Sequence, residues 1–198
     1  MKTDIYFFQA AYDGLEEKIW RVIEVSGRYM LNRLGYCVLA TFETQACHLF
    51  SLTAQGRRFV IPSGDAPLPP DTQDMASLRL EELCLKLDDT IDLVYESDPV
   101  QTFHLKLLDT KPIRGGRGLL YPYVSAGSGR GIIEGLSTEE LGELVCQIRR
   151  SGRTDRAVYY NGRPQPWDYR DFAVEPDYKL LKKKILQIDE RYQPYWEH

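Results

Sequence analysis

The sequence lacks the features of membrane and secreted proteins. It has no run of about 18 uncharged apolar residues, the length that a helix needs to cross a bilayer. The N-terminus carries Lys2 and Asp4 and lacks the long apolar core and small-residue cleavage site of a signal peptide. We therefore expect no contact with a membrane and a cytoplasmic location.

A strong charge bias is also missing. The 198 residues carry a formal net charge of −4, and 43% of them are hydrophobic. An intrinsically disordered chain has fewer hydrophobic residues and a larger net charge, so this class is excluded. Domains usually contain roughly 100–200 residues. We expect a single domain over residues 1–198.

Cysteines are few, and their spacing fits no metal site. They stand at positions 37, 47, 84 and 146, without a C-x-x-C pair or a nearby pair of histidines. Zinc sites usually take two ligands from one turn of the chain, so we expect no metal. Cys47 lies beside His48 in an apolar run. Disulfides are rare in the cytoplasm, so we expect buried, reduced thiols.

Apolar and polar residues alternate along segments that turn residues separate, which is typical of strands joined in hairpins. Such hairpins are expected at residues 4–25, 47–61 and 90–109. Because hairpins make antiparallel sheets, the pattern predicts an α+β fold in preference to a doubly wound parallel sheet. We expect one antiparallel sheet with helices packed on it.

Four segments have the patterns of helices. Residues 30–42 are apolar almost all round and predict a helix packed on one face of the sheet. A capping box that begins at Ser137 predicts a helix from there through Arg150. In residues 177–192 the apolar side chains repeat at steps of three and four, which predicts an amphipathic C-terminal helix. A short helix is expected at 78–87.

Two further segments have the composition of loops. Residues 62–76 contain four prolines and three aspartates. Proline removes a hydrogen-bond donor and restricts φ, so we expect an exposed loop here without strand or helix. Residues 111–135 are rich in glycine and basic residues, and we expect a second loop there.

Five short motifs follow one another along the chain: Ile19-Trp20-Arg21-Val22-Ile23-Glu24-Val25, Cys47-His48-Leu49-Phe50, Leu93-Val94-Tyr95-Glu96, Tyr121-Pro122-Tyr123-Val124-Ser125-Ala126-Gly127-Ser128-Gly129, and Trp167-Asp168 to Phe172. Their order resembles the Ri-plasmid ORF-three-like family, some members of which are labelled transposon-resolvase-like. The resemblance covers nearly the whole chain. It implies an α+β fold, a loose link to plasmids and mobile elements, and no established activity.

Several polar positions depart from that family's pattern. The Leu-His pair of its first helix falls on Leu34-Gly35, and its Y-D-F-G-D motif falls on Tyr95 to Pro99. The cysteine of its Y-P-x-C loop falls on Val124. Most of the polar signature that would mark a shared site is therefore absent, and we carry no site residue over from the family.

The motifs of nucleotide-binding proteins and hydrolases are not complete. Gly127 to Gly131 resembles a phosphate loop, but a dinucleotide fingerprint needs a glycine where Ile132 stands. The chain has neither a G-K-[ST] string nor a G-x-S-x-G elbow. We expect no cofactor, no catalytic residues and no enzymatic activity. The alternative is a hydrolase whose site is assembled from scattered residues around His48 or His104.

Charge is unevenly distributed along the chain. Ten acids against two bases give residues 62–98 a net charge of −8, and nine bases against five acids give residues 111–163 a charge of +4. Arginines neutralise phosphates and tyrosines stack on bases. The basic segment therefore predicts a binding surface for nucleic acid or an acidic protein, made of Lys111, Arg114, Arg117, Tyr121, Tyr123, Arg130, Arg149, Arg150, Arg153 and Arg156. Pairing of these arginines with the acidic segment is the alternative.

Overall fold

Tight turns join neighbouring strands of the chain into hairpins. Each hairpin is antiparallel: β1 (Asp4–Tyr12) with β2 (Trp20–Ser26), β3 (Phe50–Ala54) with β4 (Arg57–Val60), and β6 (Thr90–Tyr95) with β7 (Gln101–Pro112). In the first turn Gly14 has a φ of +74°, a left-handed conformation that glycine adopts without steric cost. The computed structural model describes residues 4–62, 67–113, 121–160, 163–172 and 178–196.

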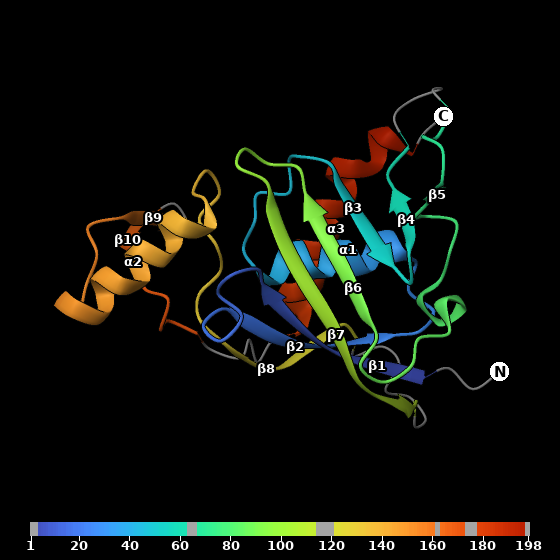
Figure 1. Cartoon of the computed structure of the whole chain (residues 1–198), viewed down its shortest axis with the longest axis horizontal. Helices are drawn as coiled ribbons and strands as arrows, with labels where there is room; N and C mark the ends of the chain where they lie inside the picture. The colour runs from blue at the N-terminus through green and yellow to red at the C-terminus, as the bar shows by residue number, and fades with distance from the viewer. Residues whose placement is uncertain (1–3, 63–66, 114–120, 161–162, 173–177, 197–198) are drawn as a thin grey trace.

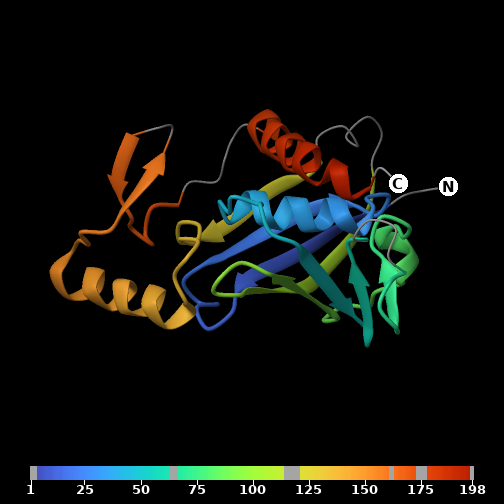
Figure 2. The same cartoon turned by 90° about the horizontal axis from the view of Figure 1, so that it is seen from above.

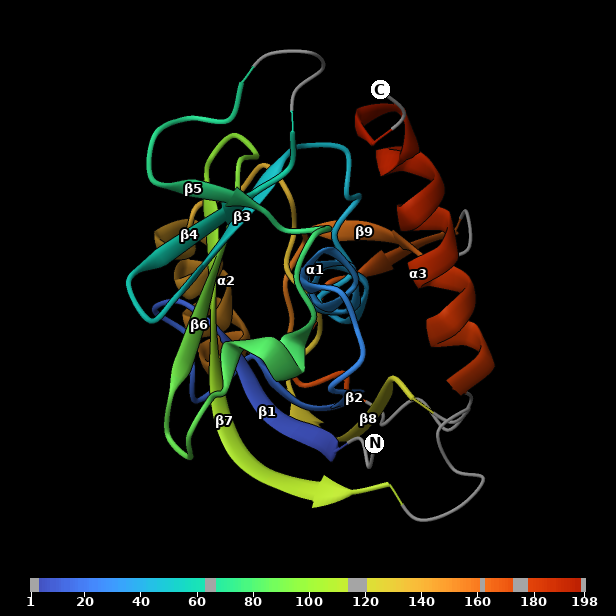
Figure 3. The same cartoon turned by 90° about the vertical axis from the view of Figure 1, so that its right-hand side faces the viewer.

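The hairpins combine into one eight-stranded sheet. Its strand order is β5-β4-β3-β6-β7-β1-β2-β8, and all neighbouring strands are antiparallel except β4 and β5. The predicted α+β fold and its three hairpins are therefore confirmed. The register shifts between Phe7 and Phe8 and between Val22 and Ile23. Such irregularities bend strands and increase their twist, in keeping with the curved sheet of Figure 3.

Helix α1 (Leu31–Thr41) fills the concave face of the sheet, as Figure 3 shows. Helix α3 (Tyr178–Tyr192) packs on the side of α1 that faces away from the sheet. The side chains of Leu34, Cys37 and Val38 have no exposed surface, because α1 is covered from both sides. The predicted helices at 30–42 and 177–192 are confirmed, except that residue 177 lies outside the described residues.

Two predictions about connecting segments were wrong. Strand β5 (Thr72–Asp74) lies within the predicted loop 62–76, and β8 (Tyr123–Ser128) lies within the predicted loop 111–135. Both are edge strands, where proline and glycine are better tolerated than at the centre of a sheet. The short helix expected at 78–87 is present as a 3-10 helix that covers only Leu80–Leu83.

Helix α2 (Thr138–Ser151) projects from the sheet together with the hairpin of β9 (Ala157–Tyr160) and β10 (Arg163–Pro166), as Figures 1 and 2 show. The predicted capping box is present, since Ser137 Oγ accepts a 3.2 Å hydrogen bond from the backbone N–H of Glu140. The β9–β10 hairpin was not predicted from the sequence. In the described part of the chain, no helix combines the length and the apolar character that crossing a bilayer requires.

Helix α1 approaches β3 closely at Gly35. A β-carbon at this position would lie 2.1 Å from Cε2 of Phe50. The Phe50 ring is buried and has edge-on contacts with the rings of Tyr36 and Tyr192. Because this ring is held on several sides, the helix reaches its observed position only with glycine at residue 35.

We predict opposite effects for two Gly→Ala substitutions in helices. Gly35→Ala should lower the free energy of unfolding by about 1–2 kcal/mol, because overpacking of the core outweighs the better helix propensity of alanine. Gly142→Ala in α2 should raise it by up to about 1 kcal/mol, because a β-carbon there meets no atom within 4 Å. Urea denaturation of both variants measures the two changes, and a stabilising effect of Gly35→Ala would contradict the packing argument.

Candidate functional site

Four exposed arginines lie at the C-terminal end of α2 and just beyond it: Arg149 and Arg150 in the last turn, and Arg153 and Arg156 after Gly152. We call these four residues the α2 arginine surface. Among the described residues none of the four has a carboxylate within salt-bridge distance. The acidic side chains of α2 are those of Glu139 and Glu140 in the first turn and Glu143 in the middle of the helix, and Asp155 stands between Arg153 and Arg156 in the sequence. The four positive charges are therefore presented to solvent.

An open groove lies beside this surface, between α2 and the turn that joins β1 to β2. Its volume is about 820 Å³. Leu15 and Lys18 line it from the turn, and Val145, Arg149 and Arg150 line it from α2. Along its helical wall the groove has basic side chains toward the C-terminal end of α2, and the acidic Glu139 and Glu143 toward the N-terminal end.

Lys111, Tyr121 and Tyr123 lie far from the α2 arginine surface. Lys111 is paired in register with Ile5, near the start of β1, whereas α2 begins against Tyr12 at its end. Strands rise by about 3.3 Å per residue, which separates the two regions by roughly 20 Å. Figure 1 shows α2 extending still farther from the sheet. Tyr123 pairs with Glu24, which pairs with Phe7 of β1, and the carbonyl of Tyr121 accepts a hydrogen bond from Tyr29, which follows β2. The structure thus does not bring these three residues together with the arginines of α2.

Two of the predicted residues cannot be placed, and Lys111 has local partners. Arg114 and Arg117 lie outside the described residues. The ammonium group of Lys111 is 3.0 Å from Asp109 and 4.6 Å from the centre of the Phe7 ring. Its charge is therefore partly compensated on its own strand.

Arg130 is buried and paired, in contrast to the arginines of α2. Its Nε lies 3.5 Å from Glu43 and one of its terminal nitrogens lies 3.9 Å from Asp171. Residues 65–98, the acidic segment, supply neither of these partners. Since only 8% of Arg130 is exposed, it contributes little to an exposed binding surface.

A second buried arginine lies close to Arg130. The guanidinium of Arg21 is 4.3 Å from the centre of the Phe172 ring and 5.2 Å from that of Phe42, and it donates hydrogen bonds to the carbonyls of Trp20 and Ser128. Burial lowers the pKa of Arg21 to about 10, although the charge of Glu43 opposes the change. These contacts hold the β2–β8 edge to the end of α1 and do not present Arg21 to a ligand.

A cavity of about 560 Å³ lies between α1, α3 and the segment after β8. Its lining includes Arg130, Glu134, Trp167, Lys184 and Arg191. Glu134 accepts a 2.6 Å hydrogen bond from the backbone N–H of Gln45, and Arg191 donates to the carbonyl of the same residue. Arg191 and Oε2 of Glu134 are thus engaged with the protein, whereas Oε1 of Glu134 is buried without a hydrogen-bond partner among the described residues.

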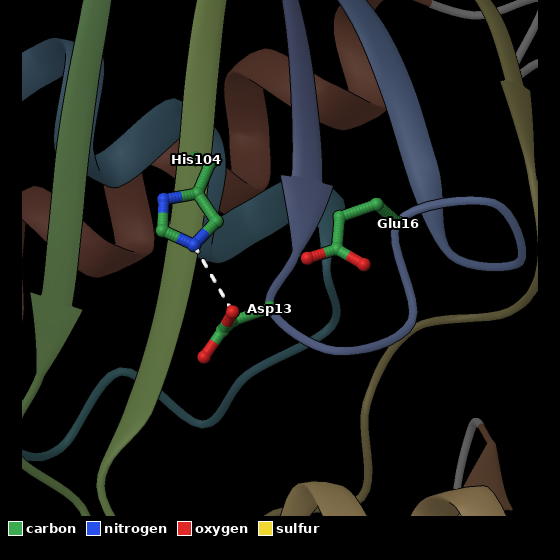
Figure 4. A group of neighbouring side chains, drawn as sticks. All are labelled: Asp13, Glu16 and His104. Carbon is green, nitrogen blue, oxygen red and sulfur yellow. Dashed lines mark hydrogen bonds and ion pairs between the residues drawn. The ribbon is translucent and has the colours of Figure 1, made fainter.

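His104 on β7 lies between two carboxylates. Its Nδ1 is 2.7 Å from Asp92 Oδ1 on β6, and its Nε2 is 3.1 Å from Asp13 Oδ1 in the β1–β2 turn. Figure 4 shows Glu16 of the same turn facing this pair. The ligand atoms of Asp13, Glu16 and His104 lie within 4.8 Å of one another. We call these three residues the His104 cluster.

The carboxylates change the acid–base behaviour of His104. Partial burial lowers its pKa, but the hydrogen bonds and charges of Asp92 and Asp13 outweigh burial, so the pKa lies above its ordinary value. A protonated imidazole donates from both nitrogens and so satisfies both carboxylates. The cluster can therefore hold either a proton or another cation on Nε2.

The prediction of buried thiols was wrong for three of the four cysteines. Cys37 is buried, and burial raises its pKa to about 12, whereas Cys47, Cys84 and Cys146 are exposed. All four are free thiols. His48 is exposed, and its ring contacts that of Tyr95 without a carboxylate partner among the described ion pairs.

Comparison with known proteins gives a family and a fold. The family model described as plasmid pRiA4b ORF-3-like protein matches residues 4–175. A crystal structure of a protein of unknown function from Methanosarcina mazei Go1, MM3350, is similar with a TM-score of 0.65 and 16% sequence identity. The similarity covers 77% of this chain and 85% of that chain. No curated protein matches the sequence.

The ion pairs of His104 predict a pH-dependent contribution to stability. Since the folded-state pKa is raised, this contribution is fully present below the unfolded-state pKa of about 6.5 and is lost as the pH rises through the folded-state value. In metal-free buffer, His104→Gln should therefore destabilise the protein most at about pH 6 and progressively less toward pH 9. Thr102→Val, on the same strand face, is the control, and its effect should not change with pH. Equal pH profiles for the two variants would refute the prediction.

Proposed function

The chain belongs to the plasmid pRiA4b ORF-3-like family, and from this starting point we propose that it is a binding module for an anionic partner. The similar structure is itself of a protein of unknown function, so neither comparison supplies an activity. The observation that carries the proposal is the α2 arginine surface, where four exposed cations lie together without a carboxylate partner among the described residues.

Helix electrostatics explain only part of this surface. Positive side chains at a helix C-terminus are favourable by roughly 0.3–1 kcal/mol each, which accounts for Arg149 and Arg150 in the last turn. Arg153 and Arg156 lie beyond Gly152, the residue that ends the helix. The helix dipole does not account for these two arginines, and an anionic partner would supply counter-charge beyond that of Asp155, which stands between them in the sequence.

The position of the surface suits contact with a large partner. Helix α2 and the β9–β10 hairpin extend away from the sheet, so that a polymer can reach the arginines without a clash with the body of the protein (Figure 2). The family's name suggests an association with plasmids, and for this reason nucleic acid is the first partner to test. An acidic protein is the second, because domains that bind nucleic acid are usually basic whereas this chain has a net charge of −4.

The hydrolase alternative has one observation in its favour. Asp92 orients His104 as a carboxylate orients a general base. However, neither His48 nor His104 lines the groove beside α2 or the cavity between α1 and α3. A binding function therefore has more support than catalysis, and we keep the proposal of a module that works in the cytoplasm without a cofactor.

Salt-dependent binding tests the proposal. Wild-type protein should bind duplex DNA, single-stranded DNA or a polyglutamate peptide at low salt, as measured by fluorescence anisotropy. For duplex DNA, the log–log slope of affinity against salt should become less steep by about 0.9 for each arginine removed from a phosphate. The combined variant Arg149→Ala, Arg150→Ala and Arg153→Ala should bind the preferred polymer about tenfold less tightly, or more weakly still.

A matched control removes three charges from other surfaces. The combined variant Arg58→Ala, Lys86→Ala and Lys183→Ala changes exposed residues of β4, of the turn before β6 and of α3. It should bind like the wild type. The proposal fails if the wild-type protein binds none of the three ligands at low salt. It also fails if the two combined variants lose the same affinity, since the loss would then reflect net charge alone. The preferred polymer decides between nucleic acid and an acidic protein.

A further inference from the structure

The His104 cluster combines residues from two distant parts of the chain. Asp13 and Glu16 belong to the β1–β2 turn, and His104 lies on β7, beside Ala11 in the β1–β7 register. The antiparallel pairing of these strands brings the imidazole to the turn, where both carboxylates face it (Figure 4). We propose that Asp13, Glu16 and His104 bind a divalent ion of the first transition series.

The donor atoms suit such an ion. Imidazole nitrogen is a preferred ligand of zinc, iron and similar metals, and carboxylate oxygen is a preferred ligand of manganese and magnesium. One nitrogen with two carboxylates therefore selects ions that accept both kinds of donor. The two carboxylates also offset the charge of a divalent ion, so that the ion and its three ligands together carry no net charge when the ion is bound.

Asp92 favours the tautomer of His104 that can bind a metal through Nε2. Its Oδ1 lies 2.7 Å from Nδ1 of the imidazole, where it accepts a hydrogen bond. A proton on Nδ1 leaves the lone pair of Nε2 free for a metal, and carboxylates in this role orient most histidine ligands of metal proteins. Nε2 is the nitrogen that faces Asp13.

The turn holds the carboxylates near their positions in a metal site. The backbone N–H of Gly14 donates a 2.9 Å hydrogen bond to Glu16 Oε1, and Asp13 Oδ1 is already 3.1 Å from Nε2 of the histidine. Metal–ligand bonds of about 2.0–2.2 Å place neighbouring ligand atoms roughly 3–3.5 Å apart. The separations that involve Glu16 are at most 4.8 Å, and the exposed side chains of a turn can shorten them by rotation.

The site is open to water. Asp13 has 54% of its side chain exposed and His104 has 40%. Three protein ligands leave further coordination positions for water, so we expect binding to be weaker than at a closed, buried metal site. The proposal does not depend on the α2 arginine surface, because the two share no residue.

Manganese is the most suitable probe for this site. It prefers oxygen and nitrogen ligands to thiolates, so the exposed Cys47, Cys84 and Cys146 interfere little. Titration of the full chain with Mn²⁺, followed by electron paramagnetic resonance of the free ion, should show one site. Substitution of any one ligand should weaken Mn²⁺ binding at least about tenfold, in the variants Asp13→Asn, Glu16→Gln and His104→Gln. Asp92→Asn, which removes the partner of His104, should weaken it by about 10–100-fold.

Glu17→Gln is the matched control, because Glu17 lies in the same turn, is 92% exposed and loses the same charge. It should leave the affinity unchanged. In wild-type protein, Mn²⁺ should broaden the NMR signals of the His104 ring before those of His48 and His198, a measurement that needs no variant to fold. The proposal is overturned if millimolar Mn²⁺ does not bind, if Glu17→Gln weakens binding as much as Glu16→Gln, or if another histidine broadens first.

Discussion

The pairing of β1 with β7 is the constraint on which the arrangement of this protein depends. Along β7, buried side chains that face the core (Phe103, Leu105 and Leu107) alternate with side chains that point to the other face, among them His104 and Lys106. A slip of one residue would exchange the two faces and expose the apolar set to water. The hydrophobic pattern thus fixes the register, and the register in turn places His104 beside the β1–β2 turn. The position of the exposed His104 cluster therefore depends on the free energy that would be lost if the apolar face of β7 were exposed to water.

Arginine has two different roles in this structure, and the difference is not visible in the residue type. Arg21 and Arg130 are buried next to Glu43, where aromatic rings and carboxylates surround them. They connect the β2–β8 edge with the end of α1. The arginines of α2 are exposed and stand at the end of a projecting helix. Runs of basic residues in a sequence therefore do not by themselves show which charges face solvent.

The parts of the fold that could be predicted are those that depend on residues close together in the sequence. The β1–β2 turn, the Ser137 cap and the stripe of α3 each depend on residues within a few positions of one another. Strands β5 and β8 depend on neighbours far along the chain, because each becomes a strand only by adding to an existing edge of the sheet. The His104 cluster joins residues that are 91 positions apart. Sequence spacing carries no signal for such a contact until the pairing of the strands is known.

The β1–β2 turn belongs to both candidate sites. Asp13 and Glu16 face His104, while Leu15 and Lys18 line the groove beside α2. Gly14 lies between them and meets the start of α2, where a β-carbon would come within 2.6 Å of Thr138 Cγ2. A cation held by Asp13 and Glu16 would restrict the same turn that carries Leu15 and Lys18. If binding at one site orders the turn for the other, linkage requires the effect to be reciprocal. The two candidate sites share no ligand residue and prefer opposite charges, and the β1–β2 turn is the element that they have in common.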